Sequence, residues 1–163
     1  VEVCFPDTNS DDDIVLHQFQ PAQPSRTEET RKRSEMSEGD LLPLCPVPLT
    51  PRLIISTALA TRDFQDVHHD RDAAHQKGSK DIFMNILSTA GITARWLGDW
   101  AGNNVIFEDL KIQLGAPNYP YDTMTMSGNV QTLNDDGSIT LSFNGDNKLG
   151  SHVKGTVTLR FTD

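Results

Sequence analysis

Hydrophobic residues are distributed unevenly along the chain. Residues 52–161 carry most of the isoleucine, leucine, valine, phenylalanine and tryptophan. The first 50 residues are instead rich in proline, aspartate, serine and glutamate. A folded core needs enough apolar surface to outweigh the entropy of ordering the chain. We therefore expect one folded domain over residues 49–163.

The polar first part of the chain has little pattern of its own. Short strand-like runs at 1–5 and 14–19 flank an acidic turn, and the charged stretch 22–40 follows without periodicity. Such a composition is typical of disordered segments, which cannot bury enough apolar area. We expect residues 1–35 to be disordered or foreign to the domain, and 36–48 to be a linker.

The domain opens with a short apolar run followed by a polar loop. Residues 49–60 read LTPRLIISTALA, which predicts a strand leading into a loop, with Pro51 at its start where a missing N–H is tolerated. Residues 61–81 are dense in aspartate and histidine and too irregular for a core element. A loop is therefore expected over this second segment.

A long helix is predicted immediately after this loop. In residues 82–102, apolar positions recur at spacings of three and four, which is typical of a helix, and Asp81 is expected to cap its start. Further apolar residues lie on its other faces, and a helix that is apolar nearly all round is a buried one. The two sets are Phe83, Ile86, Leu87, Ala90, Ala94 and Leu97, and then Ile82, Met84, Ile92, Trp96 and Trp100.

The rest of the chain alternates with period two, as strands do. Four segments show this pattern, and Asn-Asp-Asp-Gly and Asn-Gly sequences mark turns after two of them. Their inward positions are expected to be Ile106, Leu110, Ile112 and Leu114, then Met124, Met126 and Val130, then Ile139, Leu141 and Phe143, then Val153, Val157, Leu159 and Phe161. The order predicts an α+β fold, one long buried helix wrapped by a curved antiparallel sheet, which is the hotdog arrangement. Its open sheet edge and apolar helix predict pairing with a second such domain.

Charge and cysteine content exclude several classes of protein. The formal net charge of the 163-residue chain is −9, without a basic stripe, which argues against nucleic-acid binding. Cys4 and Cys45 form neither a disulfide framework nor a metal pair. No apolar run approaches a membrane span, and no signal peptide is visible. We expect a reducing, cytoplasmic setting.

The polar loop carries the most informative motif. Asp63 and His68 lie five positions apart in the segment RDFQDVH, between the first strand and the helix. The segment resembles the D-x-N-P-x-H motif of the MaoC-like hotdog hydratases, with Gln65 and Asp66 in place of the usual Asn and Pro. The wider run over 54–161, including DWAG and YPYDTMTMSG, is similar to the small catalytic subunit of heteromeric steroid enoyl-CoA hydratases of bacterial sterol side-chain degradation.

This resemblance implies a function, a partner and a set of site residues. The substrate would be the α,β-unsaturated CoA thioester of a steroid side chain, and a larger hotdog subunit would complete a heterodimer or heterotetramer. Asp63 and His68 would be the catalytic pair. The backbone N–H groups of Met84 and Asn85, at the helix start, would bind the enolate oxygen. No metal or redox cofactor is expected.

The chemistry of hydration supports these roles independently. Water must be held near the β-carbon, a proton must reach the α-carbon, and the enolate oxygen needs donors. A carboxylate and an imidazole on one short loop can hold one water, and the imidazole can pass a proton near neutral pH. A helix N-terminus supplies N–H donors and a favourable dipole to an anion.

Other interpretations of the same residues stay open. Asp63 could cap a turn, and His68 could be an exposed loop residue. His69 and Asp70 are expected to be solvated. A metal site is also conceivable, although the spacing His-x-x-x-His is absent and aspartate-rich loops are usually solvated. The candidate ligands would be Asp63, Asp66, His68, His69, Asp70, Asp72 and His75.

Two rival functions need comparison. A hotdog thioesterase would carry its carboxylate on the central helix, which has no acid between Ile82 and Gly98. A non-catalytic, acyl-CoA-binding partner subunit would not need both Asp63 and His68. Residues 1–35 in turn resemble the closing strands of the OB-fold domain that ends the larger partner subunit, and Met36 would be a natural start of the small one.

Overall fold

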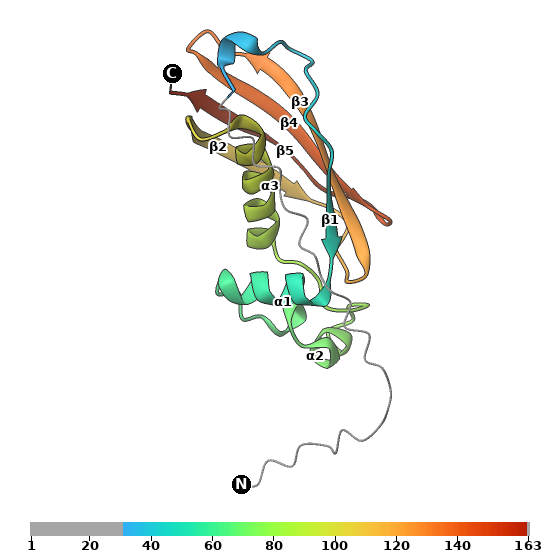
Figure 1. Ribbon diagram of the computed structural model, residues 1–163. Helices are drawn as coiled ribbons and strands as arrows, with labels where there is room; N and C mark the ends of the chain where they lie inside the picture. The colour runs from blue at the N-terminus through green and yellow to red at the C-terminus, as the bar shows by residue number, and fades with distance from the viewer. Residues whose placement is uncertain (1–30, 163) are drawn as a thin grey trace, which may run out of the picture.

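The computed structural model describes residues 31–162, which form a five-stranded antiparallel sheet, three α-helices and two 3-10 turns (Figure 1). The strand order across the sheet is β1-β3-β4-β5-β2, so β1 and β2 are the edges. In chain order the elements are η1 (Arg33–Glu35), β1 (Cys45–Leu49), α1 (Pro51–Ala60), η2 (Asp66–His68), α2 (Arg71–Gln76), α3 (Ile86–Ala101), β2 (Val105–Leu114), β3 (Asp122–Leu133), β4 (Ser138–Asn147) and β5 (Gly150–Phe161).

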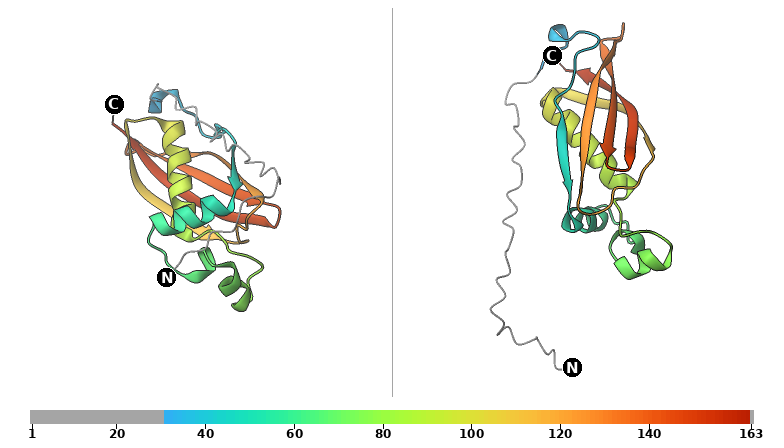
Figure 2. Two further views of the ribbon diagram at one scale, coloured as in Figure 1. Left: turned by 60° about the horizontal axis from the view of Figure 1, so that its bottom comes forward. Right: turned by 90° about the vertical axis from the view of Figure 1, so that its right-hand side faces the viewer.

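The long helix α3 lies across one face of the curved sheet, while α1 and α2 lie together at one end of it (Figures 1 and 2). The side of α3 toward the sheet buries Thr89, Thr93, Trp96, Leu97 and Trp100. These contacts place the core between the helix and the sheet. The expected α+β hotdog fold, one long helix wrapped by an antiparallel sheet, is confirmed.

The inward residues of the three central strands are those that the period-two pattern predicted. All of the following are buried: Met124, Met126 and Val130 of β3, Ile139, Leu141 and Phe143 of β4, and Val153, Val157 and Leu159 of β5. β2 departs from the prediction because a bulge between Phe107 and Asp109 shifts its register against β5. As a result Ile106 and Phe107 are both exposed, and Leu110 and Ile112 are only half-buried.

The strand predicted over residues 49–60 is wrong, because most of that segment is helix α1. Thr50 caps the helix, with its hydroxyl oxygen 3.0 Å from the Leu53 N–H that donates to it, and Pro51 occupies the first turn. Ile54 and Ala58, four residues apart, are fully buried. The apolar residues therefore follow a helical period, and the first strand, β1, ends at Leu49, just before them.

The central helix begins later than its sequence predicts. Asn85, rather than Asp81, is the N-cap, and its side-chain oxygen accepts the Ser88 N–H at 2.8 Å. Before it the chain is held extended, since the Phe83 N–H donates to the Val67 carbonyl and the Met84 N–H to the Asn118 carbonyl. Tertiary hydrogen bonds thus override the apolar periodicity in the first four predicted helical positions.

The segment expected to be a linker is part of the packed domain. Met36 and Leu42 are buried in the core, and the N–H groups of Gly39 and Leu42 donate to carbonyls of β3. Contacts already start at Arg31, whose guanidinium donates to the Trp100 carbonyl at 2.9 Å and lies over the Trp100 ring. The expected boundaries at 35 and 48 therefore do not separate this segment from the fold. The expectation for residues 1–30 lies outside the described residues.

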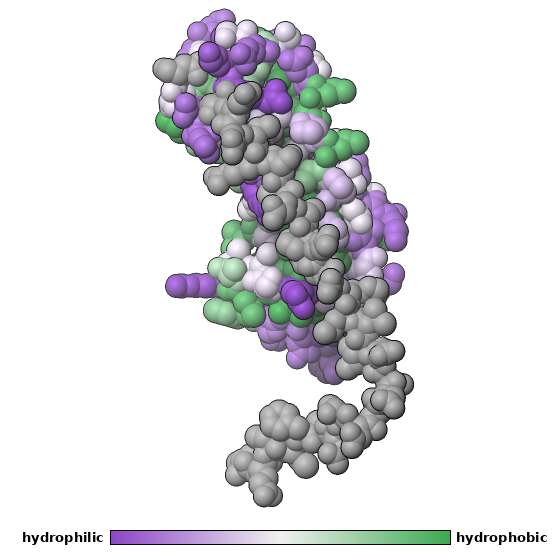
Figure 3. All heavy atoms as spheres, viewed as in Figure 1, coloured by the Kyte–Doolittle hydropathy of each residue, from purple (hydrophilic) through white to green (hydrophobic). Residues whose placement is uncertain are grey.

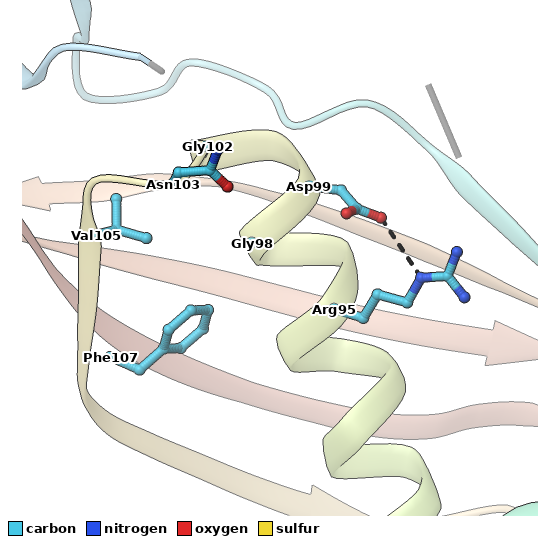
Figure 4. A pocket seen from close by; sticks show the side chains of 7 residues that line it. All are labelled: Arg95, Gly98, Asp99, Gly102, Asn103, Val105 and Phe107. Atoms are coloured by element: carbon cyan, nitrogen blue, oxygen red, sulfur yellow. Dashed lines mark ion pairs between the residues drawn. The ribbon is translucent and has the colours of Figure 1, made fainter. Parts of the chain in front are cut away.

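An open groove lies between the C-terminal end of α3 and the start of β2 (Figure 4). Its volume is about 290 Å³, and Val105 and Phe107 supply its apolar side. Arg95 and Asp99 of α3 pair along its other side at 3.6 Å. Among the helices of residues 31–162, none is both long and apolar enough to cross a membrane.

Candidate active site

Asp63 is fixed by the way α1 ends. The Arg62 N–H donates to the Leu59 carbonyl and the Asp63 N–H to the Ala58 carbonyl, which closes the last helical turn. Arg62 itself adopts a left-handed conformation with φ of 57°, uncommon for a residue other than glycine. The turn leads directly to Asp63, whose carboxylate contacts Asn85 at the start of α3. Asp63 is thus held by backbone hydrogen bonds.

His68 lies opposite Asp63 at the end of η2 and is buried. Its Nδ1 is 2.7 Å from the Phe83 carbonyl oxygen. Because a carbonyl oxygen only accepts, Nδ1 carries the proton, and Nε2 of the neutral ring is an acceptor. This Nε2 faces the Asp63 Oδ2 at 3.4 Å. The structure therefore brings together the two residues that the motif singled out.

Asn85 completes the polar cluster from the start of α3. Its Nδ2 is 2.9 Å from the Asp63 Oδ2 and 3.0 Å from the Thr61 Oγ1. Sequence reasoning expected Asn85 to act through its backbone and missed the side-chain contact. The available signal was the preference for asparagine at helix N-caps, which would have put the helix start at this residue.

Several contacts lower the pKa of the Asp63 carboxyl. The largest is the hydrogen bond from the Asn85 amide, and the Gln65 N–H and the nearby His68 and His69 act in the same direction. Partial burial opposes them by raising the pKa. Asp63 is therefore a carboxylate at neutral pH. In the neutral form of the His68 ring, Nε2 and the Asp63 carboxylate present two hydrogen-bond acceptors to one small molecule such as water.

The structure treats the two expected oxyanion donors differently. The Met84 N–H donates to the Asn118 carbonyl at 3.0 Å, so it is not free to bind a ligand. Among the described residues no acceptor is found for the N–H groups of Asn85, Ile86 and Leu87, as is usual at a helix start. The free donors of this region therefore begin at Asn85.

The other acids and histidines of the loop make local contacts. Asp70 caps α2 by accepting the Ala73 N–H at 3.0 Å, and Asp66 pairs with Lys77 at 3.3 Å. His69 contacts the Phe64 carbonyl, and His75 contacts the Lys80 carbonyl. Within residues 31–162 no three histidine, cysteine, aspartate or glutamate side chains come together as a metal site would require.

A second buried histidine lies behind the start of α3. His152 of β5 has its Nδ1 2.6 Å from the Ala116 carbonyl and its Nε2 2.9 Å from the Thr89 hydroxyl. Burial lowers its pKa, although the hydrogen bond to Ala116 acts in the opposite direction. Sequence analysis did not single out His152 or Thr89. They tie the first turns of α3 to the sheet.

Four exposed apolar side chains lie close to the polar cluster along the chain. Leu59, Phe64, Ile86 and Leu87 are 48%, 65%, 49% and 52% exposed, and they lie beside Asp63 and Asn85 in the chain or one helical turn away. In Figure 3, hydrophobic surface also gathers over the part of the molecule where α1 lies. We call these four exposed side chains the apolar rim of the candidate site.

Comparisons with known proteins identify relatives of this chain. No family model matches the chain. It is 51% identical over 125 residues to the 3-oxo-4,17-pregnadiene-20-carboxyl-CoA hydratase beta subunit of Mycobacterium tuberculosis, covering 77% of this chain and 96% of that protein. The crystal structure of the ChsH1-ChsH2 complex from the same organism matches with a TM-score of 0.75 at 50% identity, covering 77% of this chain and 98% of the matched chain.

More distant structures share the fold. The (R)-hydratase from A. caviae involved in PHA biosynthesis matches with a TM-score of 0.72 at 18% identity over 78% of this chain and 98% of its own. A MaoC-like dehydratase matches with a TM-score of 0.74 at 18% identity over 85% of this chain and 45% of its own. Since the chain is 51% identical to the mycobacterial subunit over 125 aligned residues, which cover nearly the whole of that protein, it belongs to the MaoC-like hotdog hydratase family.

Proposed function

We propose that this chain is the catalytic subunit of a heteromeric hydratase that adds water to the α,β-unsaturated CoA thioester of a shortened steroid side chain. The observation that carries the proposal is the Asp63–His68 pair, facing across 3.4 Å at the start of α3. The identity to a pregnadiene-carboxyl-CoA hydratase subunit supports the substrate class.

The geometry suggests how water is activated. Asp63 Oδ2 and His68 Nε2 are both acceptors, so one water can donate a proton to each of them. In hydration the water oxygen bonds to the β-carbon, and the proton it loses passes to the pair. The pair then returns a proton to the α-carbon, and the carbon–carbon double bond becomes single. Atoms balance without a metal or a redox cofactor.

The enolate formed on the way needs stabilisation at the thioester oxygen. The free N–H groups at the start of α3, from Asn85 to Leu87, and the positive end of the helix dipole suit an anion there. We keep the expected Asn85 donor in this role and do not assign it to Met84. The apolar side chains of Ile86 and Leu87 would exclude bulk water, which strengthens such hydrogen bonds.

A larger hotdog subunit would complete the enzyme. The apolar rim and the exposed edge strand β2, with Ile106 and Phe107, are surfaces that a partner can cover. The similarity to a chain of the ChsH1-ChsH2 complex supports a heteromer. The partner would also provide the wall against the steroid rings. Because CoA thioesters are used inside cells, we place the enzyme in the cytoplasm.

Activity assays with and without the partner test this function. The chain, alone and co-expressed with a larger hotdog subunit, is given crotonyl-CoA and a steroid enoyl-CoA, and loss of the enoyl absorbance is followed. We expect the complex to hydrate the steroid thioester far faster than crotonyl-CoA. Hydrolysis to free CoA would instead indicate a thioesterase, and activity that persists without Asp63 and His68 would assign catalysis to the partner.

A further inference from the structure

We propose that the Asn85 side chain is a positioning residue that joins the start of α3 to the Asp63 carboxylate, and that this double role requires asparagine. The inference rests on the proposed function, because it assigns a task to Asn85 within the same site. It concerns the side chain and is independent of the backbone N–H of Asn85.

The two ends of the Asn85 amide bind different parts of the molecule. Its oxygen accepts the Ser88 N–H at 2.8 Å and so caps α3. Its nitrogen donates to Asp63 at 2.9 Å and to Thr61 at 3.0 Å. Only 3% of the Asn85 surface is exposed, so the hydrogen bonds at both ends of its amide lie largely out of water.

The surroundings fix the orientation of the amide. If its oxygen and nitrogen were exchanged, the oxygen would face the Asp63 carboxylate and the nitrogen would face the Ser88 N–H. Acceptor would then meet acceptor, and donor would meet donor. Thr61 adds to this, since its hydroxyl donates to the Thr57 carbonyl at 2.8 Å and is left to accept from Asn85.

Asparagine combines two properties that its alternatives separate. Serine and aspartate cap helices well but present no amide donor to a carboxylate. Aspartate would also place a second negative charge beside Asp63, which disfavours ionisation of the pair. Glycine and alanine lose both contacts. The substitution Asn85→Ser therefore removes the amide nitrogen that reaches Asp63, while the shorter serine side chain keeps an oxygen that can cap the helix.

The remaining charged neighbours of Asp63 do not replace this donor. His68 and His69 are the titratable groups that act on it, and both come from the loop around η2. The first turn of α3 has no acidic residue, and the last turn of α1 has no basic one. The lowered pKa of Asp63, caused first by the Asn85 amide, is consistent with this arrangement.

The test measures the ionisation of Asp63 directly in the 163-residue chain with its partner subunit. Aspartate is labelled with ¹³C at the carboxyl carbon, and the Asp63 signal is identified from its loss in Asp63→Asn. In Asn85→Ser we expect this signal to titrate at higher pH than in the unsubstituted protein, with the melting temperature nearly unchanged. Asn104→Ser, an exposed asparagine beyond the other end of α3, is the matched control and should leave the titration in place.

Kinetics give a second readout that a purely structural role would not move. The acidic limb of the pH profile of kcat/KM should shift upward in Asn85→Ser, and kcat at neutral pH should fall roughly tenfold, the scale of one hydrogen bond to a charged group. In Asn85→Asp, kcat at neutral pH should fall further than in Asn85→Ser. An Asp63 titration that is identical in Asn85→Ser and the unsubstituted chain would overturn the inference.

The two proposals fail in different ways. If the unsubstituted complex hydrates no enoyl-CoA, the proposed function fails, whereas the NMR titration still decides the role of Asn85. If the complex is active and the Asp63 titration does not respond to Asn85→Ser, the proposed function stands and the positioning role is wrong.

Discussion

At the scale of single residues, the His68 ring is oriented by two contacts with Phe83. Its Nδ1–H donates to the Phe83 carbonyl, and its edge meets the Phe83 side chain with ring centres 5.0 Å apart and planes at 81°. The hydrogen bond sets the tautomer of the ring, and Nε2 then faces Asp63. The ring of the neighbouring His69 instead contacts the Phe64 carbonyl through its Nε2.

The catalytic assignment predicts a clear difference between the neighbouring histidines. Asp63→Asn or His68→Ala should lower hydration by roughly a hundredfold or more, the usual scale for a positioned acid or base, while the melting curve is retained. His69→Ala should have a small effect. Steady-state assays of the three variants decide the matter: near-normal turnover in the first two, or an equal loss in the third, would contradict the assignment.

Asp63 and His68 could be predicted from the sequence because both lie on one short loop and their spacing carries the motif. The Asn85 amide could not, because its contact with Asp63 joins residues 22 positions apart and depends on how α1 and α3 pack. Met84 illustrates the same limit. Its N–H is taken by Asn118, a residue 34 positions away whose place the local pattern does not reveal.

At the scale of elements, tertiary hydrogen bonds delay the start of α3, whereas α1 and α2 start at local side-chain caps. The periodicity of β3, β4 and β5 was sufficient to predict their inward residues, because these strands lie in the middle of the sheet. It failed for β2, an edge strand with a bulge, and for α1, whose short run of apolar residues fits a strand or a helix. The cap residue Thr50 resolves that ambiguity in the structure.

The link between β5 and α3 predicts a pH dependence of stability. Burial lowers the pKa of His152, so the folded protein resists a proton that the unfolded chain accepts near its ordinary pKa of about 6.5. Its contribution is full above about pH 6.5 and is lost as pH falls below that value.

Urea unfolding at about pH 7.5 and about pH 5.5 measures this effect. The free energy of unfolding should be smaller at the lower pH, and His152→Gln should reduce that difference. His75→Gln, a substitution at an exposed histidine, should keep it. The same pH dependence in His152→Gln as in the unsubstituted chain would show that another group is responsible.

The contact of Arg31 with the end of α3 predicts a loss of stability on truncating that side chain. Arg31 donates to the Trp100 carbonyl and lies 5.4 Å from the centre of the Trp100 ring. Arg31→Ala should cost about 1–2 kcal/mol, the sum of a helix-end hydrogen bond and a cation–π contact. Thermal unfolding of Arg31→Ala and the unsubstituted chain checks this, with Lys32→Ala, at an exposed neighbouring residue, as the control. A melting temperature of Arg31→Ala equal to that of the unsubstituted chain would contradict the prediction.

At the scale of the whole molecule, two apolar surfaces are left without cover by residues 31–162. One is the apolar rim near Asp63, and the other is the edge strand β2, where Ile106 and Phe107 are exposed. A curved sheet with one helix on its concave face cannot cover both. This is the structural reason why the fold pairs with a second copy or a related domain.

We therefore expect the isolated chain to self-associate and the co-expressed pair of subunits to form a defined complex. Light scattering coupled to size exclusion distinguishes the two. Phe107→Lys, a charge on the exposed edge strand, should weaken both kinds of association and leave the fold intact. A monomer that is stable and active at micromolar concentration would refute this expectation.

The placement of the reacting groups at one end of α3 has a consequence for redesign. The polar cluster lies at the first turn of a 16-residue helix, whereas the groove beside Phe107 lies at its far end, about 20 Å away by the rise of an α-helix. Substitutions around that groove are therefore expected to leave the contacts among Asp63, His68 and Asn85 in place, and with them the chemical step.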